Sequence, residues 1–221
     1  MEFYLDTVDI EAIRRFSKML PLAGVTTNPS IIAKNGQPVA DVLPLIRDAL
    51  DNRGHIFAQV IANTTEAMVK EAETLVSYVD GLVVKIPVTE AGLGAIKILK
   101  SRNIVTLGTA VYNATQGFFA AQAGAQYIAP YVSRIDAQGG DGVAVVTELQ
   151  YLLSRHTPEV NLLAASFKSP RQVLDCMLTG CSAVTLPITI LEQMLCSPAV
   201  NEAIEVFGND WYQAFHTRTL L

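Results

Sequence analysis

One lysine lies inside an apolar segment of the chain. Residues 81–88 read GLVVKIPV, which has the composition of a buried parallel strand, and Lys85 lies near its C-terminal end. Lysine is rarely fully buried, because burial disfavours its charged form and lowers its pKa. A neutral amine in a pocket is a nucleophile toward carbonyl carbons. The segment therefore predicts an enzyme that forms a Schiff base through Lys85.

Polar residues also follow most of the other apolar segments. They are Asp6, Thr26, Asn28, Gln59, Thr109, Tyr131, Arg134, Ser166 and Lys168. A carboxylate beside a lysine can orient it and move protons, which makes Asp6 the candidate acid or base. Arginine offers a rigid fork of donors and serine a small one, so Arg134 and Ser166 would suit a phosphate group.

These residues also have structural explanations. The Lys85 side chain could extend to the surface or form an ion pair with Asp6. Residues 26–29 could be an ordinary turn into a helix that starts with proline, and Arg134 could pair with Asp136. The functional interpretation is favoured because the residues all follow strand-like segments. In a barrel enzyme, the C-terminal ends of the strands meet at the face that carries the chemistry.

Eight short apolar segments could position these residues. They are residues 3–6, 24–26, 56–60, 82–86, 105–110, 127–130, 162–165 and 183–186. The segments are rich in Val, Ile and Leu, as expected of parallel strands covered on both faces, and they alternate with amphipathic stretches. Ser169 with Pro170, and Asp141 after the glycine pair at 139–140, mark the starts of two helices.

Eight such units predict an α/β fold, a (β/α)8 TIM barrel with an extra C-terminal helix, in a single domain over residues 1–221. A doubly wound open sheet is the competing layout, but the chain lacks the GxGxxG fingerprint.

The chain continues well beyond the eighth segment. Residues 188–196 and 198–207 predict two helices, and an aromatic stretch at 211–215 contains the only tryptophan. A (β/α)8 barrel needs only one helix after its last strand. We therefore expect the helical tail, from about residue 198 to residue 221, to pack on a neighbouring subunit. A lid, or a helix folded on its own barrel, is the alternative.

The composition argues against several other classes of protein. A formal net charge of −5 disfavours nucleic-acid binding, which needs a basic surface. No apolar run reaches the ~18 residues that span a membrane, and the acidic N-terminal segment is unlike a signal peptide. Three cysteines without CxxC spacing, and histidines without a neighbouring ligand, predict neither a disulfide nor a metal site. We expect a cytoplasmic protein that, with only 17% charged residues, associates with copies of itself.

Six motifs resemble those of one enzyme family. They are AGVTTNPSIIA at 23–33, FAQV at 57–60, VVKIPVT at 83–89, TLGTAVY at 106–112, APYVSRIDAQGGDG at 129–142 and LAASFKSPRQ at 163–172. They are similar to motifs of the transaldolase family, most closely of its fructose-6-phosphate aldolase subgroup. The resemblance implies a Schiff-base enzyme on a (β/α)8 barrel, with no metal or other cofactor. It also implies a homodecamer of two pentameric rings, in which the C-terminal helix reaches the adjacent subunit.

The resemblance also implies roles for individual residues. The matching positions are the Schiff-base lysine Lys85, the acid Asp6, the substrate-hydroxyl residue Asn28, the water- and proton-handling residues Gln59, Thr109 and Tyr131, and the phosphate-binding residues Arg134 and Ser166. Thr26, two positions before Asn28, is a further candidate for substrate binding. One position departs from the family pattern: Ser133 stands where asparagine is expected, which predicts a different aldehyde preference.

Gln59 and Tyr131 separate two activities within this family. Transaldolases carry glutamate at the position that matches Gln59, and typically phenylalanine at the position that matches Tyr131. Glutamine does not titrate near neutral pH, so it can only orient a water, and proton transfer would pass to the Tyr131 hydroxyl. We therefore expect an aldolase that reversibly cleaves fructose 6-phosphate into dihydroxyacetone and glyceraldehyde 3-phosphate. The alternatives are a transaldolase, which passes a dihydroxyacetone unit between sugar phosphates, and a non-catalytic barrel that binds sugar phosphates.

Overall fold

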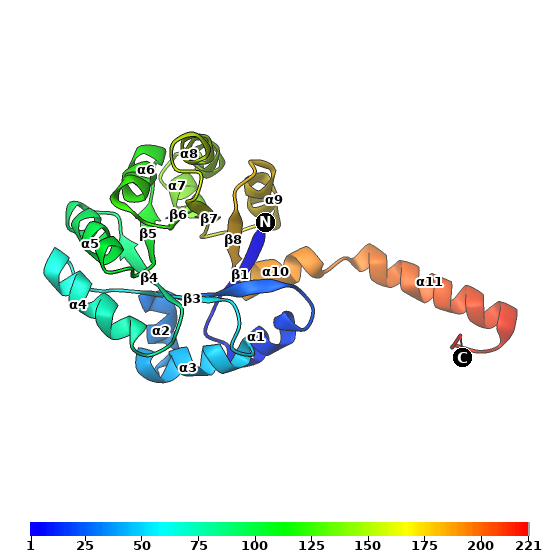
Figure 1. Cartoon of the computed structure of the whole chain (residues 1–221). Coiled ribbons are helices and arrows are strands. Elements are labelled where there is room, and N and C mark those ends of the chain that lie inside the picture. The colour runs from blue at the N-terminus through cyan, green and yellow to red at the C-terminus, as the bar shows by residue number, and fades with distance from the viewer. Residues whose placement is uncertain (221) are drawn as a thin grey trace.

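Eight parallel strands close into a barrel. The computed structural model describes residues 1–220 of the 221-residue chain. The strands are β1 (Glu2–Asp6), β2 (Leu22–Thr26), β3 (His55–Gln59), β4 (Leu82–Pro87), β5 (Thr106–Val111), β6 (Tyr127–Pro130), β7 (Asn161–Ala164) and β8 (Ala183–Leu186). They pair in sequence order, and β1 pairs with β8 to complete the barrel (Figure 1). The predicted (β/α)8 fold is confirmed.

Eleven helices connect or follow the strands within the described residues. They are α1 (Ile10–Ser17), α2 (Pro29–Asn35), α3 (Val39–Ala49), α4 (Thr65–Val76), α5 (Glu90–Ser101), α6 (Ala114–Ala123), α7 (Val132–Ala137), α8 (Gly142–His156), α9 (Pro170–Leu178), α10 (Ile188–Leu195) and α11 (Pro198–Phe215). Most of them surround the barrel (Figure 1). The short helices α2 and α7 begin almost directly after β2 and β6, so they lie at the C-terminal face of the barrel.

Side-chain caps fix the starts of most helices that follow a strand. Asp141 accepts a hydrogen bond from the Ala144 N–H at 2.9 Å and so begins α8. Ser169 caps α9, which has Pro170 in its first turn. Both starts are as predicted. A well-defined helix start of this kind keeps the preceding loop short.

Inside the barrel, apolar side chains form a cluster that we call the apolar floor. Its buried members are Tyr4, Phe57, Val83, Leu107, Tyr127, Ala129, Leu163, Ala165 and Ala183. Phe57 meets Tyr4 edge-to-face at 5.2 Å between ring centroids and Tyr127 at 5.1 Å. Such pairs stabilise beyond simple burial. The floor therefore excludes water from beneath the residues that follow it along each strand.

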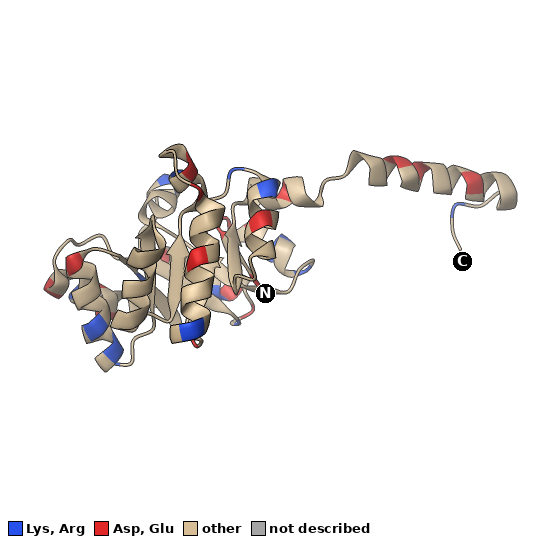
Figure 2. Cartoon of the chain, turned by 90° about the horizontal axis from the view of Figure 1, so that it is seen from above, with Lys and Arg blue, Asp and Glu red and all other residues tan. Residues whose placement is uncertain are grey.

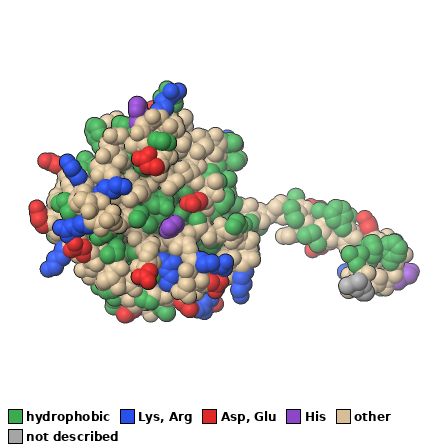
Figure 3. Space-filling view, in the orientation of Figure 1, with side chains coloured by type: hydrophobic (Ala, Val, Ile, Leu, Met, Phe, Trp, Pro, Cys, Tyr) green, Lys and Arg blue, Asp and Glu red, His purple; other side chains and the backbone are tan. Residues whose placement is uncertain are grey.

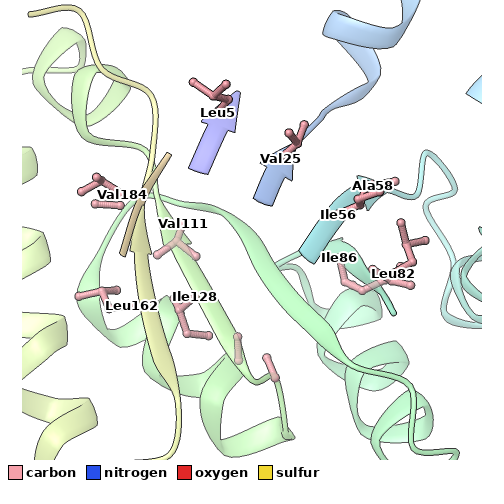
Figure 4. Close-up of a cluster of buried hydrophobic side chains, with 14 of the residues drawn as sticks. Leu5, Val25, Ile56, Ala58, Leu82, Ile86, Val111, Ile128, Leu162 and Val184 are labelled. Atoms are coloured by element: carbon pink, nitrogen blue, oxygen red, sulfur yellow. The ribbon is translucent and has the colours of Figure 1, made fainter. Parts of the chain in front are cut away.

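The outward side chains of the strands form a second core beneath the helices. Among them, Leu5, Val25, Ile56, Ile128 and Leu162 have no exposed surface (Figure 4). Strands that are buried on both faces do not alternate between apolar and polar residues. This explains why the strands were recognisable in the sequence as short, almost continuous apolar runs.

Helix α11 leaves the barrel and projects from it (Figures 1 and 3). None of its residues is buried. The prediction of a helix ending at residue 207 was too short, because one continuous helix of 18 residues runs through Gly208 and the aromatic stretch. Glycine within an exposed helix costs only about 1 kcal/mol relative to alanine, so it does not by itself end a helix.

Candidate active site

Five of the predicted residues lie one step above the apolar floor. Along the strands, the floor residue and the site residue two positions later are Tyr4 and Asp6, Phe57 and Gln59, Val83 and Lys85, Leu107 and Thr109, and Ala129 and Tyr131. A step of two residues keeps a side chain on the same face of a strand. The five polar side chains therefore converge inside the C-terminal end of the barrel, the usual place for catalysis in this fold.

Lys85 is buried, with only 6% of its surface exposed. Its Nζ donates a hydrogen bond to the backbone carbonyl oxygen of Thr27 at 2.6 Å. Thr27 is fully buried and is held by two bonds to the Phe57 carbonyl, one from its N–H and one from its hydroxyl. Lys85 therefore neither reaches the surface nor forms an ion pair with Asp6 in the described chain.

Burial favours the neutral forms of both Lys85 and Asp6, and it shifts their pKa values in opposite directions. It lowers the pKa of Lys85, against the opposing influence of the Asp6 charge, and the Arg134 guanidinium lowers it further. Burial raises the pKa of Asp6, while Lys85 and the hydrogen bond from Thr26 act against this rise. Interacting groups titrate as a pair. Together, Asp6 and Lys85 can hold one proton either as acid and amine or as two ions, so a neutral amine arises without a change in net charge.

The lowered pKa of Lys85 predicts how the rate of imine formation depends on pH. Imine formation needs the neutral amine, so its rate should rise with pH through a pKa below the ordinary value of 10.5. Asp6→Asn removes a charge that raises this pKa, and should move the rise to lower pH. Arg134→Gln removes a charge that lowers it, and should move the rise to higher pH. The measurement is the rate at which borohydride traps dihydroxyacetone on the protein as a function of pH.

The two variants serve as controls for each other. Either substitution could reduce the height of the profile, because both residues face the reacting groups. Only an electrostatic effect on Lys85 predicts shifts of opposite sign. Profiles that move in the same direction would contradict this account of the lysine.

Asp6 is held by a chain of hydroxyl groups. The Thr26 hydroxyl donates to Asp6 Oδ1 at 2.8 Å and lies 2.6 Å from the hydroxyl oxygen of Thr185 on β8. A hydroxyl has one proton, and that of Thr26 is given to Asp6, so Thr185 must donate to Thr26. Thr185 is only 3% exposed, and it is not among the predicted site residues. A threonine in an apolar strand carries no signal of its own, although it is the polar residue that β8 contributes.

Tyr131 and Thr109 form a second polar pair. Their hydroxyl oxygens are 2.7 Å apart, and the Arg134 guanidinium lies 4.7 Å from the centre of the Tyr131 ring. Burial raises the pKa of Tyr131, so its hydroxyl stays protonated at neutral pH. A protonated phenol that is already hydrogen-bonded can accept one proton while it passes on another.

Gln59 lies beside Lys85, since the two residues are paired across β3 and β4. Its Oε1 is buried and has no hydrogen-bond partner among residues 1–220. Buried polar atoms in folded proteins are normally hydrogen-bonded, so this acceptor is available to a water or to a ligand. Gln59 can therefore hold a water or a substrate hydroxyl next to Lys85.

Asn28 has a structural function as well. Its Oδ1 accepts from the Ile31 N–H at 3.0 Å, which caps α2, and Pro29 lies in the first turn of that helix. The interpretation as a turn into a proline-started helix is thus confirmed. The amide nitrogen of Asn28 still has two protons that it can donate to substrate hydroxyls.

Arg134 does not pair with Asp136. The carboxylate of Asp136 instead accepts from the Gly142 N–H at 2.7 Å and from Gln172 Nε2 at 2.6 Å. No carboxylate in the described chain forms an ion pair with Arg134, which is exposed. The predicted alternative of a structural salt bridge is therefore wrong. Ser166 Oγ lies 2.9 Å from Ser133 Oγ, next to Arg134 in the chain.

Three other features bear on the chemistry. Within residues 1–220, no group of three or more His, Cys, Asp or Glu side chains is placed to hold a metal ion. Burial raises the pKa of Cys176 to about 12 and that of Cys181 to about 11, so both thiols remain protonated. Among the described helices, none is long and apolar enough to cross a bilayer.

A known protein family matches the chain over nearly its whole length. A family model described as transaldolase/fructose-6-phosphate aldolase matches residues 3–219. The matched range includes Lys85 and every other residue of the site. This chain therefore belongs to the transaldolase/fructose-6-phosphate aldolase family.

Proposed function

We propose that the protein is a Schiff-base aldolase that reversibly cleaves fructose 6-phosphate into dihydroxyacetone and glyceraldehyde 3-phosphate. The strongest support is the environment of Lys85. Its amine is buried, its pKa is lowered by that burial, and it is hydrogen-bonded to a carbonyl rather than ion-paired. An amine in this state is a nucleophile toward a ketone.

In the first step, the neutral Lys85 amine attacks the C2 ketone of the sugar. The bond to Thr27 uses one N–H and leaves the lone pair of the nitrogen for the attack. Water must then leave from the carbinolamine to give an iminium ion, and the departing oxygen needs a proton. Asp6 suits this task, because burial raises its pKa and a carboxylic acid beside the amine can donate.

In the second step, the bond between C3 and C4 breaks. Its electron pair moves into the iminium group, which becomes an enamine, and C4 becomes the aldehyde of glyceraldehyde 3-phosphate. The proton of the C4 hydroxyl passes through a water on Gln59 to the Tyr131 hydroxyl, which hydrogen-bonds to Thr109 and gives up its own proton toward the enamine carbon. Arg134 and Ser166 hold the phosphate until the aldehyde leaves.

In the last step, the enamine carbon gains a proton and the iminium is hydrolysed. The proton gained at carbon balances the proton lost from the C4 hydroxyl, so Tyr131 acts as a relay and ends unchanged. Water returns the C2 ketone, releasing dihydroxyacetone and free Lys85. General acid–base catalysis of this kind contributes roughly 10²–10⁴-fold to a rate.

Transaldolase is the second candidate, since it would use the same lysine and the same enamine. The two differ in what receives the enamine: a proton in an aldolase, or an aldose phosphate in a transaldolase. Gln59 favours the aldolase, because an amide beside Lys85 cannot titrate and leaves Tyr131 as the proton carrier. A non-catalytic barrel that binds sugar phosphates is disfavoured by the buried amine.

A product assay tests the proposal. Fructose 6-phosphate is incubated with the protein alone, and in parallel with erythrose 4-phosphate. An aldolase releases free dihydroxyacetone in both samples. A transaldolase forms sedoheptulose 7-phosphate and depends on the acceptor for turnover, and this result would overturn the proposal. Absence of both products would favour the non-catalytic barrel.

We also propose that α11 joins copies of the chain into a homo-oligomer, a decamer of two pentameric rings. Val200, Ile204, Phe207, Trp211 and Phe215 recur every three or four residues and are all exposed, which makes one apolar face. The charged residues of α11 are all acidic (Figure 2). A helix with an exposed apolar face of this length is typical of an interaction surface.

A groove on the barrel could receive this face. It has a volume of about 500 Å³ and lies between α2, α3 and α4. Its apolar lining includes Ile32, Ala33, Val39, Val60, Leu75 and Tyr78. Because α11 and the groove are different surfaces, a contact between α11 of one copy and the groove of the next would be head-to-tail. Repeated head-to-tail contacts form a closed ring when the rotation between neighbouring copies divides a full turn evenly.

We predict that Phe207→Glu lowers the oligomeric state. A charge in the centre of the apolar face of α11 would be buried without a partner on association. Ile61→Glu at the groove, where Ile61 is 76% exposed, should have the same effect. Sedimentation equilibrium measures the outcome. Asn209→Glu adds the same charge to the opposite side of α11 and should leave the assembly intact, and dissociation by all three variants would contradict the docking model.

A further inference from the structure

The paired backbone of β6 and β7 continues beyond the ends of both strands. Tyr131 forms a parallel bridge with Ala165, and the Val132 N–H donates to the Ala165 carbonyl at 3.0 Å. The Ser133 N–H then donates to the Ser166 carbonyl at 2.8 Å. This extension brings two serines from different strand ends next to each other, beside Arg134.

Ser166 has an unusual backbone conformation. Its φ of 64° lies in the left-handed region, which residues other than glycine and asparagine seldom adopt. Such residues persist only where the surroundings hold them, and they are concentrated at functional sites. Here Ser133 supplies the hold at two points, through its N–H to the Ser166 carbonyl and through its hydroxyl at 2.9 Å.

The two hydroxyls together have one proton to offer a ligand. One serine must donate to the other across the 2.9 Å contact, so a single O–H remains free. When Ser133 donates, the free proton belongs to Ser166, and its oxygen is polarised by the bond that it accepts. Chains of hydrogen bonds strengthen one another in this way. Removal of the Ser133 hydroxyl leaves Ser166 free to rotate and weakens it as a donor.

The surroundings of the pair favour an anion. Arg134 has no ion-pair partner in the part of the chain that the structure describes, and its guanidinium is stacked on the Tyr131 ring at 4.7 Å. The nearby carboxylate of Asp136 is occupied by Gly142 and Gln172. The guanidinium is thus held in place and its charge is not neutralised by a protein carboxylate.

We propose that Ser133 is a positioning residue that fixes the Ser166 hydroxyl for the phosphate of the aldehyde, and thereby sets the preference for phosphorylated over neutral aldehydes. This inference rests on the proposed aldolase function. Ser133 acts through Ser166, so it should influence the binding of the aldehyde and not the formation of the Schiff base.

Synthesis with dihydroxyacetone tests this role. With glyceraldehyde 3-phosphate as the aldehyde, Ser133→Ala should raise KM roughly fivefold, as expected for one lost hydrogen bond, and change kcat less than twofold. With unphosphorylated glyceraldehyde, KM should change less than twofold. Ser133→Thr keeps the hydroxyl and should restore KM for the phosphorylated aldehyde. Equal effects on both aldehydes, no effect on either, or failure of Ser133→Thr to restore KM would overturn the proposal.

A trapping experiment separates this proposal from the proposed function. Borohydride with dihydroxyacetone should attach the ketone to Lys85 in the unmodified protein and in Ser133→Ala alike. If the unmodified protein forms no adduct, the Schiff-base function itself fails. If the adduct forms but the aldehyde preference does not change, only the role of Ser133 is refuted. Equal melting temperatures of the Ser133 variants would exclude a general loss of folding as the cause of a changed KM.

Discussion

Replacement of Lys85 by methionine should abolish turnover, with a loss on the order of 10⁴-fold or more, because the proposed covalent intermediate forms on the Lys85 amine. Methionine keeps an unbranched chain of similar length and removes the amine. The barrel should remain folded, because the variant no longer buries an ionisable group, and this gain offsets the hydrogen bond that the Thr27 carbonyl loses. Turnover of fructose 6-phosphate and a thermal melt measure the two effects.

Borohydride trapping followed by peptide mass analysis provides the direct check. With dihydroxyacetone, the adduct should lie on the peptide that contains Lys85 and should be absent from Lys85→Met. Lys97→Met is a matched control, because Lys97 is exposed on α5, the helix that follows β4. This control should keep both activity and adduct. An adduct that survives in Lys85→Met would place the Schiff base on another lysine and contradict the mechanism.

The barrel could be predicted because its strands are buried on both faces. Each predicted strand lies within two residues of an observed one, and β6 and β8 match at both ends. The predicted and observed ends differ where a polar residue ends an apolar run. For example, β3 was expected to include Val60, yet it ends at Gln59, the residue that faces the site. Parallel strands that are buried on both faces leave a strong apolar signal, so the errors in their predicted ends are small.

The sequence predicted the polar residues of the site, but not the backbone and loop contacts that hold them. The residues above the apolar floor were found because each is polar and follows an apolar run. The acceptor of the Lys85 hydrogen bond was not foreseen, since it is the backbone carbonyl of Thr27, and a carbonyl leaves no mark in the sequence. Nor was the bond between Ser133 and Ser166, which depends on how two loops pair beyond their strands.

The helix of the C-terminal tail is longer than the sequence predicts. Glycine, asparagine and aspartate at residues 208–210 look like a break, but α11 continues to Phe215. Helices in proteins are usually stabilised by tertiary packing, yet α11 has no buried residue, so packing on its own barrel does not explain why it continues. The exposed apolar face of α11 is the surface that the proposed contact with another copy of the chain would cover.

The choice between aldolase and transaldolase depends on how a proton moves near Lys85. Tyr131 is a hydrogen-bonded phenol whose pKa is raised by burial, and Gln59 is an amide with a buried, unpartnered oxygen among residues 1–220. The phenol can relay a proton and the amide can only orient a water. If Tyr131 transfers the proton and Gln59 only orients the water, then a residue that titrates at position 59 should be able to take over the proton transfer when the Tyr131 hydroxyl is removed.

Tyr131→Phe should therefore slow the cleavage of fructose 6-phosphate by roughly 10²–10⁴-fold, the usual contribution of a proton-transfer group. The ring is kept, so its contact with Arg134 should remain. Imine formation should be affected little, because Lys85 and Asp6 are unchanged. Steady-state release of glyceraldehyde 3-phosphate and borohydride trapping of the imine measure these two steps separately. Tyr112→Phe makes the same change in the neighbouring tyrosine, 5.9 Å away between ring centroids, and should have a small effect.

A second substitution tests the division of labour itself. Gln59→Glu in the Tyr131→Phe background introduces a group that titrates beside Lys85, so it should recover part of the lost cleavage through the bound water. Without the Tyr131 relay, the enamine should be protonated more slowly and should react more often with an added aldose phosphate. We therefore expect the recovered activity to favour transfer to erythrose 4-phosphate over release of dihydroxyacetone. If the double variant were no more active than Tyr131→Phe, the proton would not travel through the water beside Gln59.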